Sequence, residues 1–182
     1  RFDPPLEALP VVEISADEEH HGRYGPIDKL VDGLYSNSGA SVQWAPGVTP
    51  TVTRELSGET TVTTVELRDW SGMNEDWQMA GRWLQISSDG FEDDVRDLGE
   101  AFEQTGTQRW GGNMNSIYEA QVNQRAKQIR LILEPANRED ARVYVAEVMV
   151  RGARPAALPK ITAIASGDMG VVAGSDSGQI RA

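Results

Sequence analysis

The sequence predicts an all-β fold, a β-sandwich of the jelly-roll kind. Residues 51–56 and 60–67 are rich in β-branched side chains that alternate with a period of two, and Ser57-Gly58 separates them. Turn residues also close the other apolar segments with strand character, at 82–87, 126–133 and 142–150. Many short strands with turn signals between them are typical of a sandwich or a jelly roll.

The elements before and between these strands are less regular. Residues 1–24 read as an N-terminal arm with one short apolar run at 9–14, which predicts a first strand or an arm. Residues 91–104 have helical propensity that Gly99 weakens, and we expect a short helix or an insertion loop there. Residues 116–127 also favour a helix on propensity alone, and we expect tertiary context to override this near the end of the segment.

Composition excludes several classes of protein. Of the 182 residues 39% are hydrophobic and 25% charged, as in a folded soluble domain. The formal net charge of -11 argues against nucleic-acid binding and against docking on anionic membranes. Without cysteine the chain can form neither disulfides nor thiolate metal sites. No apolar run reaches the roughly 18 residues that would span a bilayer.

The last part of the chain differs in composition from the rest. Residues 153–160 form a Pro/Ala linker, and 161–182 contain two short apolar runs with turn residues after each. This pattern predicts successive hairpin strands, as at the start of a propeller blade, unless the tail packs elsewhere. The N-terminus lacks a signal-peptide pattern and reads as mature or trimmed. We expect a fragment of a larger, exported protein, extracellular or periplasmic.

Five segments, taken in order, resemble one known family. They are the "LVDG" loop that leads to Trp44, the strand pair at 55–67, "LQISSDG" at 84–90, "AKQIRL" at 126–131 and "VYVAEVMVRG" at 143–152. The order is similar to that of the discoidin, or coagulation factor 5/8 type C, domain. This galactose-binding-like jelly roll also serves as a family of carbohydrate-binding modules. The resemblance covers roughly residues 25–152.

The sequence departs from the family pattern in its loops, which are where this family binds ligands. The segment from Phe91 to Tyr118 is longer than usual, and Pro46 and Pro50 delay the strand that follows Trp44.

The opening loop offers ligands for a calcium ion. Asp32 has a carboxylate, Asn37 and Ser38 have side-chain oxygens, and calcium takes six to eight oxygens. The resemblance implies a distant partner, since Glu147 would close a structural calcium site with the carbonyl of Ala146. The alternative is that Asp-Gly forms a turn and Glu147 is a solvated strand residue.

Aromatic residues in loop-like segments indicate a sugar-binding surface. Trp70 and Trp77 lie in "RDWSGMNEDWQMAG", and Arg109, Trp110 and Asn113 lie in "QRWGGNMN". Aromatic faces with a few aimed polar groups are typical of small-molecule sites. The alternative is that these rings plug the end of the barrel, because large aromatic side chains are usually mostly buried. Trp44 and Trp83 stand in strand-like contexts, and we expect both in the core.

Two further clusters favour no specific chemistry. His20-His21 are adjacent, so they point in different directions and chelate a metal poorly without a third ligand. Acid runs are usually solvated faces, as we expect for Asp89, Glu92, Asp93, Asp94 and Asp97. No phosphate loop or nucleophile elbow is present.

We therefore expect a non-catalytic carbohydrate- or surface-binding module of a larger exported protein, with a glycan or a cell-surface protein as its partner. The second hypothesis is a structural interaction module that docks to another domain or subunit and binds no sugar. Exposure of Trp70, Trp77 and Trp110 at one loop end would favour the first. An enzyme would need convergent acids with shifted pKa values and is the least favoured class.

Overall fold

The prediction of an all-β fold is confirmed. The computed structural model describes residues 6–19, 25–33, 41–69, 79–110 and 113–153, together with the backbone of 161–167, 170–175 and 180–181. The strands of the main sheet are β1 (Glu7–Ala8), β2 (Val11–Ala16), β3 (Val42–Gln43), β4 (Thr51–Asp69), β5 (Gly81–Ser87), β6 (Arg96–Asp97), β7 (Phe102–Trp110), β8 (Asn113–Glu134) and β9 (Tyr144–Ala153). Within the described residues the one helix is the 3-10 helix η1 (Ile27–Val31).

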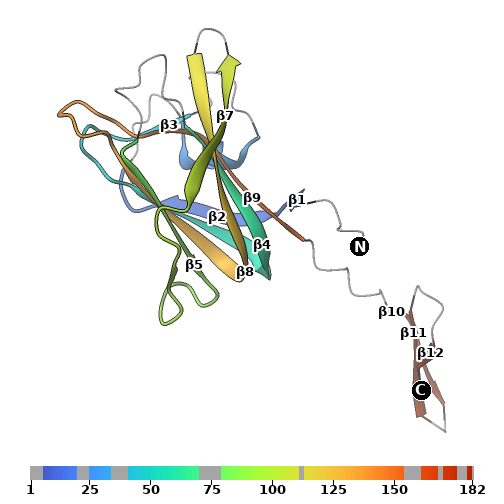
Figure 1. The fold of residues 1–182 in the computed structure, drawn as a ribbon. Coiled ribbons are helices and arrows are strands. Elements are labelled where there is room, and N and C mark those ends of the chain that lie inside the picture. The colour runs from blue at the N-terminus through green and yellow to red at the C-terminus, as the bar shows by residue number, and fades with distance from the viewer. Residues whose placement is uncertain are drawn as a thin grey trace.

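Two long antiparallel strands, β4 and β8, form the spine of the sheet, and each changes partners midway (Figure 1). The first half of β4 pairs with β2 and its second half with β9. The first half of β8 pairs with β7 and its second half with β5. Irregular register around Ser57-Gly58 and after Val62 marks the bend, where Asn123 on β8 has a φ of 52°. The two predicted strands at 51–56 and 60–67 are thus one bent strand.

The two halves of the bent sheet face each other across one core. Arg54, on the first half of β4, donates from Nη1 to the carbonyl of Val148 on β9 in the other half. Apolar side chains of both halves fill the space between, among them Val52, Leu84, Ile129 and Leu131 from one and Val62, Val65, Leu67, Ala120, Val148 and Val150 from the other. This arrangement is the predicted jelly-roll sandwich.

Neither segment with helical propensity forms a helix: the override expected near the end of 116–127 extends over the whole segment, and 91–104 keeps the alternative of a loop in its first part. Residues 116–127 belong entirely to β8, where buried Tyr118, Ala120 and Val122 alternate with the more exposed Glu119 and Gln121. The segment pairs with β4 and β7, and every second side chain is buried in the core. This burial outweighs the weak helical propensity of the segment. The segment 91–104 holds a loop, then the short strand β6, and finally the start of β7.

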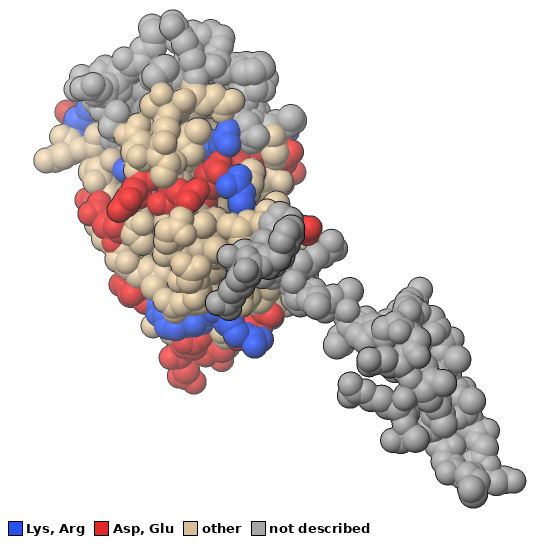
Figure 2. All heavy atoms as spheres, turned by 45° about the vertical axis from the view of Figure 1, so that its right-hand side comes forward, with Lys and Arg blue, Asp and Glu red and all other residues tan. Residues whose placement is uncertain are grey.

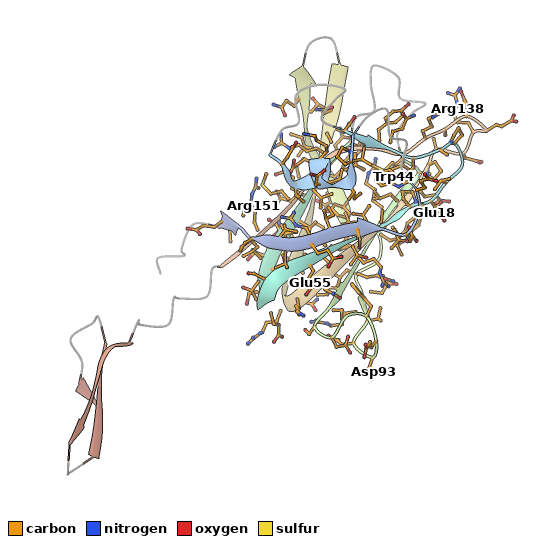
Figure 3. The ribbon with its side chains drawn as sticks, turned by 180° about the vertical axis from the view of Figure 1, so that it is seen from behind. Glu18, Trp44, Glu55, Asp93, Arg138 and Arg151 are labelled. Atoms are coloured by element: carbon orange, nitrogen blue, oxygen red, sulfur yellow. The ribbon has the colours of Figure 1, made fainter. Side chains whose placement is uncertain are left out.

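The two tryptophans expected in the core differ. Trp44 is fully buried, and its Nε1 donates to the carbonyl of Glu18 at 3.3 Å (Figure 3). Trp83 is only half-buried, so that expectation is wrong. Buried Leu84 and Ile86 alternate with Trp83 along β5, which places Trp83 on the opposite face of the sheet. Its ring packs so closely on Gly81 that a Cβ there would overlap it.

The chain after β9 forms a separate sheet. β10 (Ile161–Gly167), β11 (Gly170–Ser175) and β12 (Ile180–Arg181) pair antiparallel in that order. Hairpin strands were predicted here, while a propeller blade stays a prediction. Across the described parts of the chain, none of the helical structure has the length and apolar character of a membrane span.

Candidate functional site

The backbone brings the two tryptophan-bearing segments to the same end of the sandwich. Asp69, which directly precedes Trp70, ends β4 and pairs with Ser116 on β8. Trp110 ends β7 and pairs with Asn113, three residues before Ser116 on the same strand. The β7–β8 hairpin projects at this end of the molecule (Figure 1). The predicted ligand residues Arg109, Trp110 and Asn113 therefore lie together at the tip of one hairpin.

Several predicted features lie outside the described residues. These are Trp70, Trp77, Asn37, Ser38 and the pair His20-His21. The side chains of Arg109, Trp110 and Asn113 are likewise outside the description, although their strands are within it. Exposure of the tryptophan rings, which would separate the two functional hypotheses, stays untested.

A buried polar cluster lies directly behind this loop end. Asp69 Oδ2 accepts a hydrogen bond from Arg82 Nη2 at 3.0 Å, and only 2% and 12% of the two side chains are exposed. The Arg82 guanidinium stacks over the ring of Tyr118 at 3.6 Å from its centroid. Burial, together with the charge of Asp69, raises the pKa of Tyr118. Asp69, which precedes residues 70–78, is thus tied to Arg82, which follows them, and Arg82 in turn packs on Tyr118 of β8.

Sequence reasoning missed this cluster. The signal available to it was weak. Asp69 and Arg82 stand at the two ends of a tryptophan-bearing segment, each next to a tryptophan, and opposite charges at loop ends are common.

The predicted long-range neighbours Asp32 and Glu147 do meet at the junction of η1 with β9. Glu147 is 3% exposed, and its Oε2 accepts the backbone N–H of Gly33 at 3.1 Å. Gly33 has a φ of 73°, which a glycine adopts without strain and which turns its N–H toward β9. Lys29 Nζ donates to Asp32 Oδ2 at 2.9 Å. The hypothesis that Glu147 is a solvated strand residue is therefore wrong.

Electrostatics at this junction are unusual for a surface loop. The pKa of Glu147 is raised to about 7, mainly by burial and in smaller part by the neighbouring charge of Asp32, while the Gly33 N–H, Arg54 and Arg68 oppose the shift. Arg54 is itself buried, and burial lowers its pKa to about 10. A carboxylate in such a place needs compensation by a cation or by hydrogen bonds.

The ligand chemistry at the junction suits a hard cation, with all candidate groups offering oxygen. Within the described residues no group of three or more acidic, histidine or cysteine side chains is placed to hold a metal. A cation here would therefore depend on Asp32, Glu147 and the carbonyl of Ala146, with further oxygens from the loop that contains Asn37 and Ser38.

The acidic cluster after β5 is organised by its own contacts. Asp89 Oδ2 accepts the backbone N–H groups of Asp93 and Asp94 at 3.0 and 2.9 Å. These bonds, the first of them above all, and one from Ser87 hold the pKa of Asp89 at about 2. Figure 3 shows Asp93 and Arg138 at opposite ends of the molecule, so Arg138 takes no part in this acidic cluster. The cluster forms a self-contained turn.

Comparison with known proteins gives a likeness in structure only, because no family model and no curated protein matches the sequence. The structure is similar to the family 32 carbohydrate-binding module of AlyQ, solved with 4,5-unsaturated mannuronic acid. That match has a TM-score of 0.56 and 19% identity, and it covers 81% of this chain and 99% of the module.

Two further solved structures show the same likeness. One is a family 32 module from Clostridium perfringens in complex with GalNAc-β-1,3-galactose, with a TM-score of 0.55, 20% identity and coverage of 79% of this chain and 99% of that one. The other is a pectin-binding module, with a TM-score of 0.55, 16% identity and coverage of 83% and 96%. The chain therefore has the galactose-binding-like jelly-roll fold of these carbohydrate-binding modules.

Proposed function

We propose that this chain is a non-catalytic carbohydrate-binding module and that its ligand site lies at the tip of the β7–β8 hairpin. The observation that carries this proposal is the likeness in fold to sugar-bound modules over about four-fifths of the chain. The location is supported by the strand ends at Asp69, which precedes Trp70 in the sequence, and at Trp110, because both lie at the same end of the sandwich. Aromatic faces stack on sugar rings, and Arg109 and Asn113 offer hydrogen bonds to hydroxyl groups.

Charge narrows the class of glycan. Of the similar structures, the AlyQ module was solved with 4,5-unsaturated mannuronic acid, and another is a pectin-binding module. The charge of this chain favours a different class of ligand. With a formal net charge of -11, this chain repels polyanions, so we expect neutral or amine-bearing glycans as ligands. The proposal also keeps the expected export of the parent protein, since the polysaccharides that such a module would meet lie outside the cell.

Affinity electrophoresis and a glycan array on the full chain test the proposal. Trp110→Ala should abolish retention by neutral glycans while leaving the melting temperature unchanged, and Trp110→Phe, which keeps an aromatic ring, should keep part of that retention. If the wild-type chain binds no glycan, or if Trp110→Ala binds as well as the wild type, the loop site is excluded. The structural interaction module, which docks without sugar, is then the better hypothesis.

We also propose a structural calcium ion at the junction of η1 with β9. Asp32 and Glu147 would hold it with the carbonyl of Ala146, and Asn37 and Ser38 would complete the set. The ion would supply the positive charge that a buried carboxylate beside a second acid requires. It would fasten the opening loop to the last strand of the sandwich.

Thermal unfolding with calcium and with a chelator tests this second proposal. Chelation should lower the melting temperature of the wild type and leave that of Glu147→Gln unchanged, because the variant has lost a ligand. Glu139→Gln removes the same charge from an exposed loop and should respond like the wild type. Equal melting temperatures of the wild type with and without calcium would exclude the site.

A further inference from the structure

Three glutamates form a row straight across the outer face of the second half-sheet. Glu103 on β7 pairs with Glu119 on β8, and Glu119 pairs in turn with Glu66 on β4. Their neighbours along β8, Tyr118 and Ala120, are buried in the core, so the glutamates point to the opposite face. Figure 2 shows a band of acidic side chains crossing the molecule, with basic side chains toward one end.

This row is unfavourable by itself. Side chains directly opposite each other in neighbouring strands have Cβ atoms about 5 Å apart, and like charges there destabilise the sheet. Among the described residues, the compensating positive charges lie at the β4 end. Glu66, whose side chain is 6% exposed, accepts a hydrogen bond from Arg68 Nε at 2.6 Å and forms an ion pair with Arg151 Nη2 at 3.0 Å.

At the β7 end of the row, neither Glu103 nor Glu119 forms an ion pair with a residue that the structure describes. Glu119 accepts one hydrogen bond, from Gln121 Nε2 at 2.7 Å. Glu103 is exposed, and within the described residues its carboxylate makes no hydrogen bond or ion pair. The glutamate on β4 is thus buried and paired with two arginines. Those on β8 and β7 are more exposed and lack an arginine or lysine partner among the described residues.

A buried hydroxyl beside the row points independently to a polar ligand. Thr64 lies two residues before Glu66 on β4 and therefore on the same face, opposite Gln121 on β8 and Arg151 on β9. It is 4% exposed, and its Oγ1 has no hydrogen-bond partner among the described residues. Buried hydroxyl groups without a partner are uncommon because they lose their bonds to water.

We propose that this face is a second carbohydrate subsite that takes an amine-bearing sugar. The ammonium group would lie between Glu103 and Glu119, and ring hydroxyls would bond to Gln121 and Thr64. Carboxylates together with amide and hydroxyl groups match a ligand that carries positive charge and many hydroxyls.

The subsite is separate from the hairpin tip. Glu119 lies six residues beyond Asn113 on β8, which is about 20 Å along an extended strand. The saccharide class rests on the proposed function, whereas the requirement for an amine rests on the row alone. The two can therefore fail independently.

Isothermal titration of the full chain with two matched probes tests the inference. A glucosamine hexamer and an N-acetylglucosamine hexamer have the same backbone and differ in the charged amine. We expect the amine-bearing hexamer to bind at least about tenfold tighter at low salt, with an affinity that falls as salt is added. Equal affinities for the two probes would overturn the inference.

Variants locate the effect. Glu103→Gln and Glu119→Gln should each reduce the preference for the amine about tenfold, because each removes one charged acceptor. Glu139→Gln is the charge-matched control and should leave it unchanged. Thr64→Val should weaken binding without lowering the melting temperature, since it removes a hydroxyl that lacks a partner in the free protein. If Glu103→Gln, Glu119→Gln and Thr64→Val all bind the probes as the wild type does, this face is excluded as the subsite.

Two further measurements separate the alternatives. A lysine hexamer with an acetylated N-terminus has the same number of amines without the sugar, and binding as tight as that of the glucosamine hexamer would overturn the saccharide class in favour of a basic peptide. Trp110→Ala should retain the preference for the amine while losing neutral glycans. If the wild type binds neutral glycans without preferring the amine, only this inference fails. If the preference for the amine exists but Trp110→Ala loses nothing, only the loop site fails.

Discussion

The junction of η1 with β9 and the acidic loop after β5 each hold a carboxylate that accepts hydrogen bonds from the backbone. The pKa of this carboxylate is raised at the junction and lowered in the loop. At the junction, burial raises the pKa of Glu147 to about 7. In the loop, bonds from neighbouring N–H groups hold the pKa of Asp89 at about 2, in contact with solvent. Hydrogen bonds alone favour the charged form, and burial reverses the balance.

The two regions also differ in how far their partners lie apart in sequence. Glu147 meets Gly33 across 114 residues, whereas Asp89 meets Asp93 across four. Only the folded sandwich can form the first contact, while the second closes a local turn. Disruption at the junction should therefore lower the stability of the whole domain, whereas disruption in the loop should have a smaller, local effect.

The largest expected effect is that of Arg54→Ala. Arg54 is 4% exposed, and it donates to the carbonyls of Val148 and Leu9 while facing Glu147. Its removal leaves these groups buried without their cation and should cost about 3–5 kcal/mol in urea unfolding. Arg54→Lys keeps the charge but loses the planar fork, so it should cost less. A loss below about 1 kcal/mol for Arg54→Ala would contradict the view that this cation bridges the two half-sheets.

Gly33→Ala should have the next largest effect. The φ of 73° at Gly33 is a left-handed conformation that a Cβ makes unfavourable by about 1–2 kcal/mol, although no atom stands within 4 Å of the added carbon. Gly58→Ala is the matched control, since Gly58 has equally open surroundings without the positive φ. Equal stabilities of the two variants in urea unfolding would show that the turn at Gly33 relaxes freely.

The acidic loop should respond to Asp89→Asn with a smaller loss, and one that depends on pH. Since the pKa of Asp89 falls from 3.8 to about 2 on folding, its contribution is fully present above pH 4 and is lost as the pH falls toward 2. The difference in melting temperature between wild type and variant should shrink over that range. Asp93→Asn removes the same charge but leaves the backbone donor, so it should change little. A constant difference from pH 6 to pH 2 would contradict the assigned cause.

Particular residues show what could be predicted from the sequence. The alternating strands and the proximity of Asp32 to Glu147 were predicted, the first from a period of two and the second from the resemblance. The strand at 116–127 and the position of Trp83 were not predicted. Both depend on which face of each strand is turned toward the core, and that is set by the bend of the sheet. The pair Asp69–Arg82 and the row of glutamates depend on register between strands far apart in sequence. Local patterns carry no information on register of that kind.

The smallest expected effect is that of Arg125→Gln. Its guanidinium lies 3.2 Å from Glu59, and 66% and 42% of the two side chains are exposed. Water screens this pair, and ordering two long side chains offsets the attraction, so the variant should lose less than about 0.5 kcal/mol in urea unfolding. Glu59 also lies near Ser88 at the base of the acidic loop, at 3.4 Å, so the variant tests whether that loop depends on the pair. A loss as large as that of Arg54→Ala would show that solvent exposure does not determine how much a charged side chain contributes to stability here. Burial could then not explain the contrast between the junction and the loop.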